Sequence, residues 1–405
     1  MAQLLPFRAL RPVPLVASRV AAVPYDVVTT EEARALAKDE PLSFLHVTRS
    51  EIDLPASTPP YDPSVYARAA DNFVMLADEA PLILDYQPSL YLYRQQMDGH
   101  VQTGVAACFS VDEYERGVIK KHEKTRPDKE DDRTRHIIEL RAQTGVVFLT
   151  YRAAPAIDVV TTRVCGETPL YDFTADDGIR HTVWTVPVAD ARALEIAFGY
   201  VPALYIADGH HRAASAARAR ATLREQGERT TEADSFIAVA FPDTEVRILP
   251  YHRVVKDLHG HSPETFLAAL RTRMEVRDGS PDPRSAGEVS MFLDGRWHTL
   301  VLPGSPAGTS RSDSLGVAVL QREVLEPMFG IADVRTDKRI EFVGGSRGTD
   351  ALEHLVTSGQ AAVAFSMFPV TVDDLMAIAD EGGIMPPKST WFEPKLRDGL
   401  LVHQI

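Results

Sequence analysis

Cysteine is scarce in this chain: Cys108 and Cys165 are the two cysteines among 405 residues, and they lie far apart. This excludes a disulfide framework and a paired-cysteine metal site, and it suits a reducing compartment. No apolar run approaches the ~18 residues that a membrane-spanning helix needs. The short apolar stretch at the N-terminus is broken by prolines and arginines and lacks the plan of a signal peptide. We therefore expect a cytoplasmic protein with no membrane association.

An excess of positive charge is also missing, since the formal net charge is −14. Such a chain repels a polyanion at long range, so binding to nucleic acid would need a strong local basic patch. The best candidate, residues 120–126, is followed at once by the acidic run 128–132. We therefore expect a small-molecule substrate and no nucleic-acid partner, while a homodimer stays open.

Several motifs with known chemistry are missing as well. The chain has no GxxxxGK[ST] phosphate loop, no GxGxxG after a strand, no protein-kinase motif set and no GxSxG elbow. The zinc motif HExxH is missing too, and the adjacent His210 and His211 do not easily bind one ion together. Zinc is therefore the weaker metal hypothesis.

The length suggests two or three domains. We expect an N-terminal α+β region at 1–104, a core at 105–250 and a C-terminal α+β region at 251–405. Strands and helices mix without strict alternation, which predicts an α/β to α+β fold with mixed sheets. The main expected elements are strands at 43–47, 146–151, 157–164 and 204–207, a helix at 129–143 ended by Gly145, and a helix at 212–226.

The strongest local pattern is Asp208-Gly209-His210-His211-Arg212, between an apolar strand and an alanine-rich helix. The first N–H groups of a helix lack helical partners and lie at the positive end of the dipole, so they bind anions. Gly209 permits a sharp turn. Asp208 offers a carboxylate to a metal ion, and the last three residues offer cations or donors. The pattern predicts a phosphate site with a metal ion; the alternative is a helix that Asp208 merely caps.

A second cluster, Lys121-His122-Glu123-Lys124-Thr125-Arg126, surrounds one carboxylate with cations. The cations keep Glu123 ionised, and a carboxylate beside a substrate hydroxyl can act as general base. The flanking cations would neutralise phosphoryl oxygens. The alternative is an exposed charged loop.

A third candidate is the segment 383–395 near the C-terminus. Its Gly-Gly pair, consecutive prolines and aromatic pair indicate an ordered loop. Lys388 is the residue of this loop that we expect to contact an anion. Simple packing of a C-terminal arm is the alternative.

Four short boxes carry a family resemblance: Pro24-Tyr25-Asp26, His122-Glu123-Lys124-Thr125, Asp208-Gly209-His210-His211-Arg212 and Met385-Pro386-Pro387-Lys388-Ser389-Thr390. In this order they resemble a large bacterial and archaeal family of unknown function, often labelled ParB-like, over nearly the whole chain. The second histidine-containing box is also similar to that of free serine kinases in the ParB/sulfiredoxin superfamily. The resemblance implies a central ParB/sulfiredoxin-like nucleotide-binding core.

The resemblance further implies a small-molecule kinase that uses ATP or ADP with Mg²⁺ and phosphorylates a hydroxyl such as that of free L-serine. The alternatives are a nucleotide hydrolase, another phosphate-handling enzyme such as a sulfiredoxin-like one, or a ParB-like nucleotide-dependent regulatory or DNA-partition protein. Under the kinase hypothesis Glu123, His122 and Asp208 are catalytic, and Asp208 holds the metal. The expected nucleotide- and phosphate-binding residues are Gly209, His210, His211, Arg212, Lys124, Thr125, Arg126 and Lys388.

Overall fold

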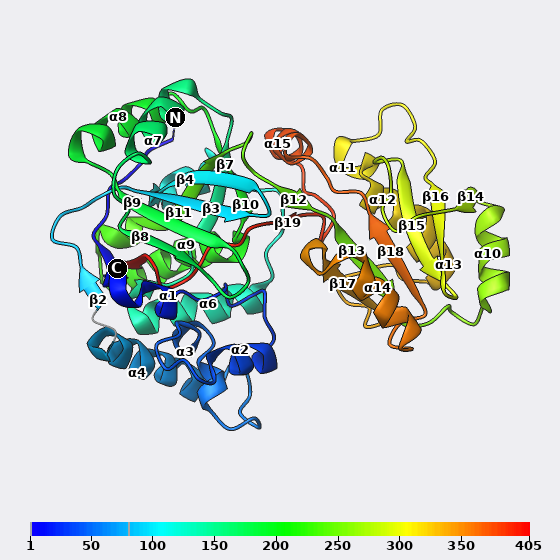
Figure 1. The fold of residues 1–405 in the computed structure, drawn as a ribbon, viewed down its shortest axis with the longest axis horizontal. Helices are drawn as coiled ribbons and strands as arrows, with labels where there is room; N and C mark the ends of the chain where they lie inside the picture. The colour runs from blue at the N-terminus through cyan, green and yellow to red at the C-terminus, as the bar shows by residue number, and fades with distance from the viewer. Residues whose placement is uncertain (1, 80–81) are drawn as a thin grey trace. The chain divides into compact units, whose positions relative to one another are not determined.

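A computed structural model describes residues 2–79 and 82–405. The chain divides into two compact units, Met1–Val246 with Pro394–Ile405, and Arg247–Glu393. Each unit contains sheets flanked by helices, as Figure 1 shows, so the expectation of a mixed α/β fold is confirmed at this level. The units differ from the three expected regions. The expected limit between 104 and 105 falls inside strand β4 (His100–Ser110), and the C-terminal segment, residues 394–405, belongs to the first unit.

The first unit is built on an eight-stranded mixed sheet. Its two parallel pairs are β5 with β10 and β7 with β11, and its other neighbours are antiparallel. In sheet order the strands are β5 (Ile119–Lys120), β10 (Leu204–Asp208), β7 (Val147–Tyr151), β11 (Ser235–Pro242), β4, β3 (Tyr91–Met97), β9 (Arg180–Thr185) and β8 (Tyr171–Thr174).

The two faces of this sheet have different neighbours, because successive side chains of a strand point to opposite faces. Leu92 of β3 packs in an apolar core with three helices, α7 (Pro155–Val164), α8 (Val188–Phe198) and α9 (His210–Glu225). Gln95 of β3 instead donates through Nε2 to the carbonyl of Lys395, at 2.7 Å. The C-terminal segment therefore runs along the face opposite to these helices (Figure 1).

A second core of the first unit lies under a four-stranded sheet, in which β20 is central. The strands in order are β2 (Leu82–Leu84), β1 (Ala9–Pro12), β20 (Val402–Gln404) and β6 (Ala142–Gln143). The further helices of this unit are α1 (Ala17–Val20), α2 (Thr30–Ala37), α3 (Leu45–Thr48), α4 (Pro63–Glu79), α5 (Val111–Glu115) and α6 (Pro127–Leu140).

Three sequence expectations for this unit are wrong. Residues 157–164 form helix α7 and not a strand, with Ile157, Val160 and Val164 buried at helical spacing. The expected strand at 43–47 is not formed, because residues 45–47 belong to helix α3 and residues 43–44 precede it. The helix expected at 129–143 is α6, which ends before Gly145, because Arg141 takes a left-handed conformation at φ 51°.

The second unit has a six-stranded antiparallel sheet and a two-stranded one. The large sheet runs β14 (Glu275–Asp278), β16 (Arg296–Val301), β15 (Glu288–Leu293), β18 (Val363–Met367), β13 (Tyr251–Val255) and β17 (Ile340–Gly344). The small one pairs β12 (Ile248–Leu249) with β19 (Trp391–Phe392). The helices are α10 (Pro263–Arg271), α11 (Arg311–Ser314), α12 (Gly316–Leu320), α13 (Glu326–Phe329), α14 (Gly348–Thr357) and α15 (Val372–Asp380).

Candidate functional site

The first part of the site is the predicted strand–turn–helix junction, which is confirmed. Strand β10 ends at Asp208, Gly209 forms the turn, and helix α9 begins at His210, slightly earlier than expected. Gly209 has φ 95°, a left-handed conformation that side chains rarely adopt. An added Cβ would also lie 3.2 Å from the guanidinium of Arg212. We call residues 208–212 the Asp208 loop.

A parallel strand pair brings the second box to the same edge of the sheet. Strand β5 pairs with β10 in the register Ile119↔Leu204 and Lys120↔Tyr205. Parallel strands end at the same edge, so residues 121–126, which we call the Glu123 loop, emerge beside the Asp208 loop. This long-range pairing explains why two boxes far apart in sequence share one site.

The two loops meet at two histidines and one glutamate. The His122 and His210 rings pack edge to face with their centroids 4.4 Å apart. The His122 backbone N–H donates to Nε2 of His210 at 3.4 Å, and Nδ1 of His210 lies 4.0 Å from Oε2 of Glu123. His122 and His210 are buried, whereas the Glu123 side chain is 39% exposed. The catalytic candidate Glu123 therefore faces solvent with two buried imidazoles behind it.

Both of these histidines are neutral near pH 7. Burial lowers the pKa of His122 to about 4, against weaker opposing effects of the Ile206 backbone and Asp208. The pKa of His210 is lowered well below its ordinary value, by burial first and then by His122. Neutral imidazoles offer a lone pair to a proton or a metal ion.

Asp208 remains ionised. Burial alone would raise its pKa, but the charges of Lys395 and Arg212 outweigh burial and hold the pKa below its ordinary value. Its Oδ2 accepts from Lys395 Nζ at 3.4 Å and from Arg212 Nη2 at 3.3 Å. Both cations contact the same carboxylate oxygen.

Arg212 is held by protein groups and is buried. Its Nη1 donates to the carbonyl of Val146, and its Nη2 donates to Asp26 at 3.2 Å as well as to Asp208. The sequence predicts that Arg212 binds phosphate; the structure places its guanidinium on Asp208, Asp26 and the Val146 carbonyl. The hydrogen bond from Arg212 to Asp26 places the Tyr25-Asp26 box beside the site.

The remaining residues of the Glu123 loop lead into α6. The Arg126 N–H donates to Nε2 of His211 at 3.0 Å, while its side chain pairs with Asp128 at 2.7 Å. Thr125 Oγ1 donates to Glu130. Thr125, Arg126 and His211 thus link the loop to its neighbours, and Lys124 is exposed.

Lys388 belongs to the second unit, where its Nζ lies 5.4 Å from the ring centroid of Tyr251 and its carbonyl accepts from Arg253 at 3.1 Å. The lysine that contacts Asp208, beside Arg212, is Lys395, which lies in the same predicted ordered loop and was assigned no role from the sequence. Lys395, Arg397 and Asp398 are all buried, which is uncommon for charged residues. Their burial comes from the fold, so the sequence alone gave no signal for Lys395.

Hydrogen bonds of Arg397 and Asp398 hold the C-terminal segment in place next to Lys395. Tyr93 accepts from the Arg397 N–H at 3.3 Å, and the Arg397 Nε contacts His181 at 3.2 Å. Asp398 exchanges two backbone hydrogen bonds with Ala22, of 2.9 and 3.1 Å. Burial raises the pKa of the Asp398 carboxyl to about 7, although the charge of Arg212 opposes this.

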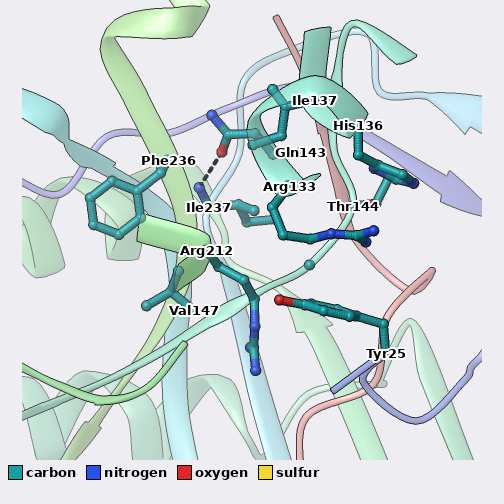
Figure 2. A pocket seen from close by; sticks show the side chains of 11 residues that line it. Tyr25, Arg133, His136, Ile137, Gln143, Thr144, Val147, Arg212, Phe236 and Ile237 are labelled. Carbon is teal, nitrogen blue, oxygen red and sulfur yellow. Dashed lines mark hydrogen bonds between the residues drawn. The ribbon is translucent and has the colours of Figure 1, made fainter. Parts of the chain in front are cut away.

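A small pocket of about 20 Å³ lies behind the Asp208 loop, with room for about one water. Figure 2 shows Arg133 over the ring of Tyr25 and the side chain of Arg212 pointing into the same space. The Arg133 guanidinium lies 4.3 Å from that ring's centroid. Gln143 accepts from the Ile237 N–H at 3.0 Å, the dashed bond in the figure. Arg212 is one of the residues that line this pocket, and the pocket is too small for a substrate.

Comparison with known proteins identifies the family. The family described as "Protein of unknown function (DUF1015)" matches residues 4–322. The chain belongs to this family. The matched part includes both loops of the candidate site, and the C-terminal segment lies beyond it. No curated protein matches the chain.

Solved structures give only distant likenesses. A conserved hypothetical protein from Pyrococcus furiosus is 15% identical, with a TM-score of 0.35, and the match covers 74% of this chain and 94% of that one. A free serine kinase in complex with AMP is 14% identical, with a TM-score of 0.37 and coverage of 74% and 91%. C-terminally truncated SbnI from Staphylococcus aureus is 14% identical, with a TM-score of 0.40 and coverage of 73% and 86%. Within the described residues, no helix combines the length and apolar character needed to cross a membrane.

Proposed function

We propose that this protein is a phosphotransferase that moves a phosphoryl group from ATP or ADP to the hydroxyl of a small molecule. The observation that carries the proposal is the meeting of the Glu123 loop with the start of α9 beside Asp208 and Lys395. One edge of the sheet then combines a carboxylate, a helix N-terminus and a cation. Phosphoryl transfer needs such a combination of positioning and charge stabilisation.

The phosphoryl group would bind at the start of α9. The first N–H groups of a helix have no partner inside the helix, and the left-handed Gly209 lets a ligand approach them. Lys395 would supply the positive charge that the sequence analysis assigns to Lys388. Arg212 fixes Asp208, so that the carboxylate keeps one orientation during the reaction.

Glu123 would act as the general base. It takes the proton of the acceptor hydroxyl as the new oxygen–phosphorus bond forms and the bond to the leaving nucleotide oxygen breaks. Nδ1 of the buried, neutral His210 lies 4.0 Å from this carboxylate, which is beyond hydrogen-bond distance. The negative charge of the transferred phosphoryl group lies on its oxygens, which would face Lys395 and the positive N-terminal end of α9.

The residues fit Mg²⁺ through Asp208. Mg²⁺ is usually held by one or two carboxylates together with substrate phosphates. The Arg212 and Lys395 contacts described above both fall on Oδ2, so an ion would bind through Oδ1. When bound there, Mg²⁺ would neutralise charge on the nucleotide phosphates.

Free L-serine is the first acceptor to test, because the resemblance of the Asp-Gly-His-His-Arg box to free serine kinases suggests it. The purified protein, incubated with ATP or ADP, Mg²⁺ and L-serine, should form O-phosphoserine, and a panel of hydroxyl compounds tests other acceptors. Phosphate release that no acceptor changes would instead indicate a nucleotide hydrolase. Absence of both transfer and phosphate release would contradict the proposal.

Lys395→Met tests the new site residue, because it keeps the aliphatic stem and removes the charge. A charged hydrogen bond contributes about 1.5–3 kcal/mol, so the KM for the nucleotide should rise about 10- to 100-fold. Lys256→Met is the matched control, since that lysine pairs with Glu341 in the second unit. Equal KM values for the two variants would exclude Lys395 from the site.

A further inference from the structure

Three metal-binding side chains meet where the Glu123 loop touches the start of α9. His122, Glu123 and His210 each offer one ligand atom, and these atoms all lie within 4.8 Å of one another. The sequence argued against a zinc site, because the adjacent His210 and His211 do not easily bind one ion together. In the structure, the second histidine beside His210 in this group is His122, which comes from the Glu123 loop, and not His211.

The state of His122 points to a ligand. The residue is 2% exposed, and among the described residues it is the histidine whose two ring nitrogens both lie buried without a hydrogen bond that meets distance and angle limits, although the Ile206 backbone is close enough to act on its pKa. Two other buried histidines do have partners: His136 Nε2 contacts the Val47 carbonyl at 3.0 Å, and His403 Nε2 contacts the Glu232 carbonyl at 2.9 Å. Leaving a buried polar atom unsatisfied is costly, so such atoms ask for an explanation.

We propose that His122, Glu123 and His210 bind a divalent transition-metal ion of the Zn²⁺, Mn²⁺ or Co²⁺ class. Two imidazoles and one carboxylate are the ligand set of this class, whereas Mg²⁺ prefers oxygen ligands alone. The site differs from the Mg²⁺ position at Asp208, both in its residues and in its chemistry.

The geometry requires a small contraction. Ligand atoms about 2.0 Å from one ion lie roughly 3.3 Å apart in a tetrahedron, so the farthest pair here must approach by about 1.5 Å at most. Glu123 is part-exposed and can make most of this movement. Binding through Nδ1 of His210 places its ring proton on Nε2, and the 3.4 Å contact with the His122 N–H is then given up.

The catalytic meaning of this ion rests on the proposed function, but its binding does not. An ion beside Glu123 would lower the pKa of a coordinated substrate hydroxyl and assist its deprotonation. Binding is therefore measured without nucleotide or turnover. A chain that binds the ion but transfers no phosphate would contradict the proposed function alone.

The test is a Co²⁺ titration of the metal-stripped full chain, purified without a histidine tag and followed by visible absorption. We expect one Co²⁺ per chain, resistant to a large excess of Mg²⁺ and displaced by Zn²⁺. His122→Asn, His210→Asn and Glu123→Gln should each weaken binding at least about 100-fold, more than the loss of an outer partner does. His354→Asn, in an exposed position on α14, is the matched control and should bind as the wild type does.

Glu123→Gln keeps the test decisive if a buried histidine variant does not fold, because its side chain is part-exposed. Unchanged Co²⁺ binding in folded Glu123→Gln and His210→Asn would overturn the proposal. So would wild-type binding that Mg²⁺ displaces, or wild-type binding no tighter than that of the variants.

Discussion

Glu123 is the residue on which the proposed chemistry depends most. Glu123→Gln keeps the size and removes the base, so kcat for transfer should fall about 10²- to 10⁴-fold while the nucleotide still binds. Single-turnover kinetics together with a nucleotide titration separate the two effects. The control is Glu139→Gln, an exposed carboxylate on α6 that pairs with Arg135. A Glu123→Gln variant with wild-type kcat would exclude the base role.

Asp398 predicts a pH dependence of stability. Its pKa of about 7 exceeds that of an unfolded aspartate near 4, so between these values the native state holds a proton that the unfolded chain has lost. This contribution to stability is complete below pH 4 and is lost as the pH rises to 7, by up to about 4 kcal/mol.

Asp398→Asn cannot ionise, so its stability relative to the wild type should increase from pH 4 to 7 and then level off. Urea unfolding of both proteins at pH 5, 6, 7 and 8 checks this. Parallel pH profiles would show that Asp398 does not titrate in this window.

At the scale of single residues, the sequence predicted candidate site residues from their local chemistry. Glu123 among cations and Asp208 before a helix were recognised in this way. Lys395 and Asp398 were missed, because their importance comes from the return of the C-terminal segment to a sheet formed hundreds of residues earlier. Arg212 was recognised as part of the site, but its burial against Asp26 depends on tertiary structure.

At the scale of elements, the turn at Gly209 couples backbone conformation to the site. Gly209→Ala should cost about 1 kcal/mol or more from its left-handed backbone, and the new Cβ should push Arg212 away from Asp208. Gly227→Ala is the matched control, since its φ is 83° and nothing lies within 4 Å of an added Cβ.

Both variants should lose similar stability in thermal unfolding. Only Gly209→Ala should lose phosphoryl transfer, because only its Cβ meets the site. Equal loss of activity in the two variants would mean that stability, and not the position of Arg212, explains the effect.

Elements with a clear local signal were predictable, and others were not. The β10–turn–α9 junction follows from an apolar run, a glycine and an alanine-rich stretch. Helix α7 was taken for a strand because it is rich in β-branched residues, although Pro155 at its start and the spacing of its buried residues favour a helix. The parallel pairing of β5 with β10, which joins the two loops, has no local signal at all.

At the scale of the whole molecule, the chain end completes the first unit. Leu396, Leu400, Leu401 and Val402 are all buried, and β20 lies between β1 and β6. Burying each such side chain stabilises by about 1.5–3 kcal/mol, and their sum is comparable with the ~5–15 kcal/mol stability of a typical domain.

Truncation after Glu393 should therefore unfold or strongly destabilise the first unit. The second unit, which the truncated chain retains whole, should keep its thermal transition in calorimetry. If all transitions stay unchanged, the C-terminal segment is not part of the first unit's core.

The central claim is that phosphate binds where the Glu123 and Asp208 loops meet. The most direct measurement is a crystal structure of the full chain with Mg²⁺ and a non-hydrolysable ATP analogue. We predict the terminal phosphate at the start of α9, within contact of Lys395 and facing Glu123. A nucleotide bound elsewhere, with this edge of the sheet uninvolved, would contradict the account.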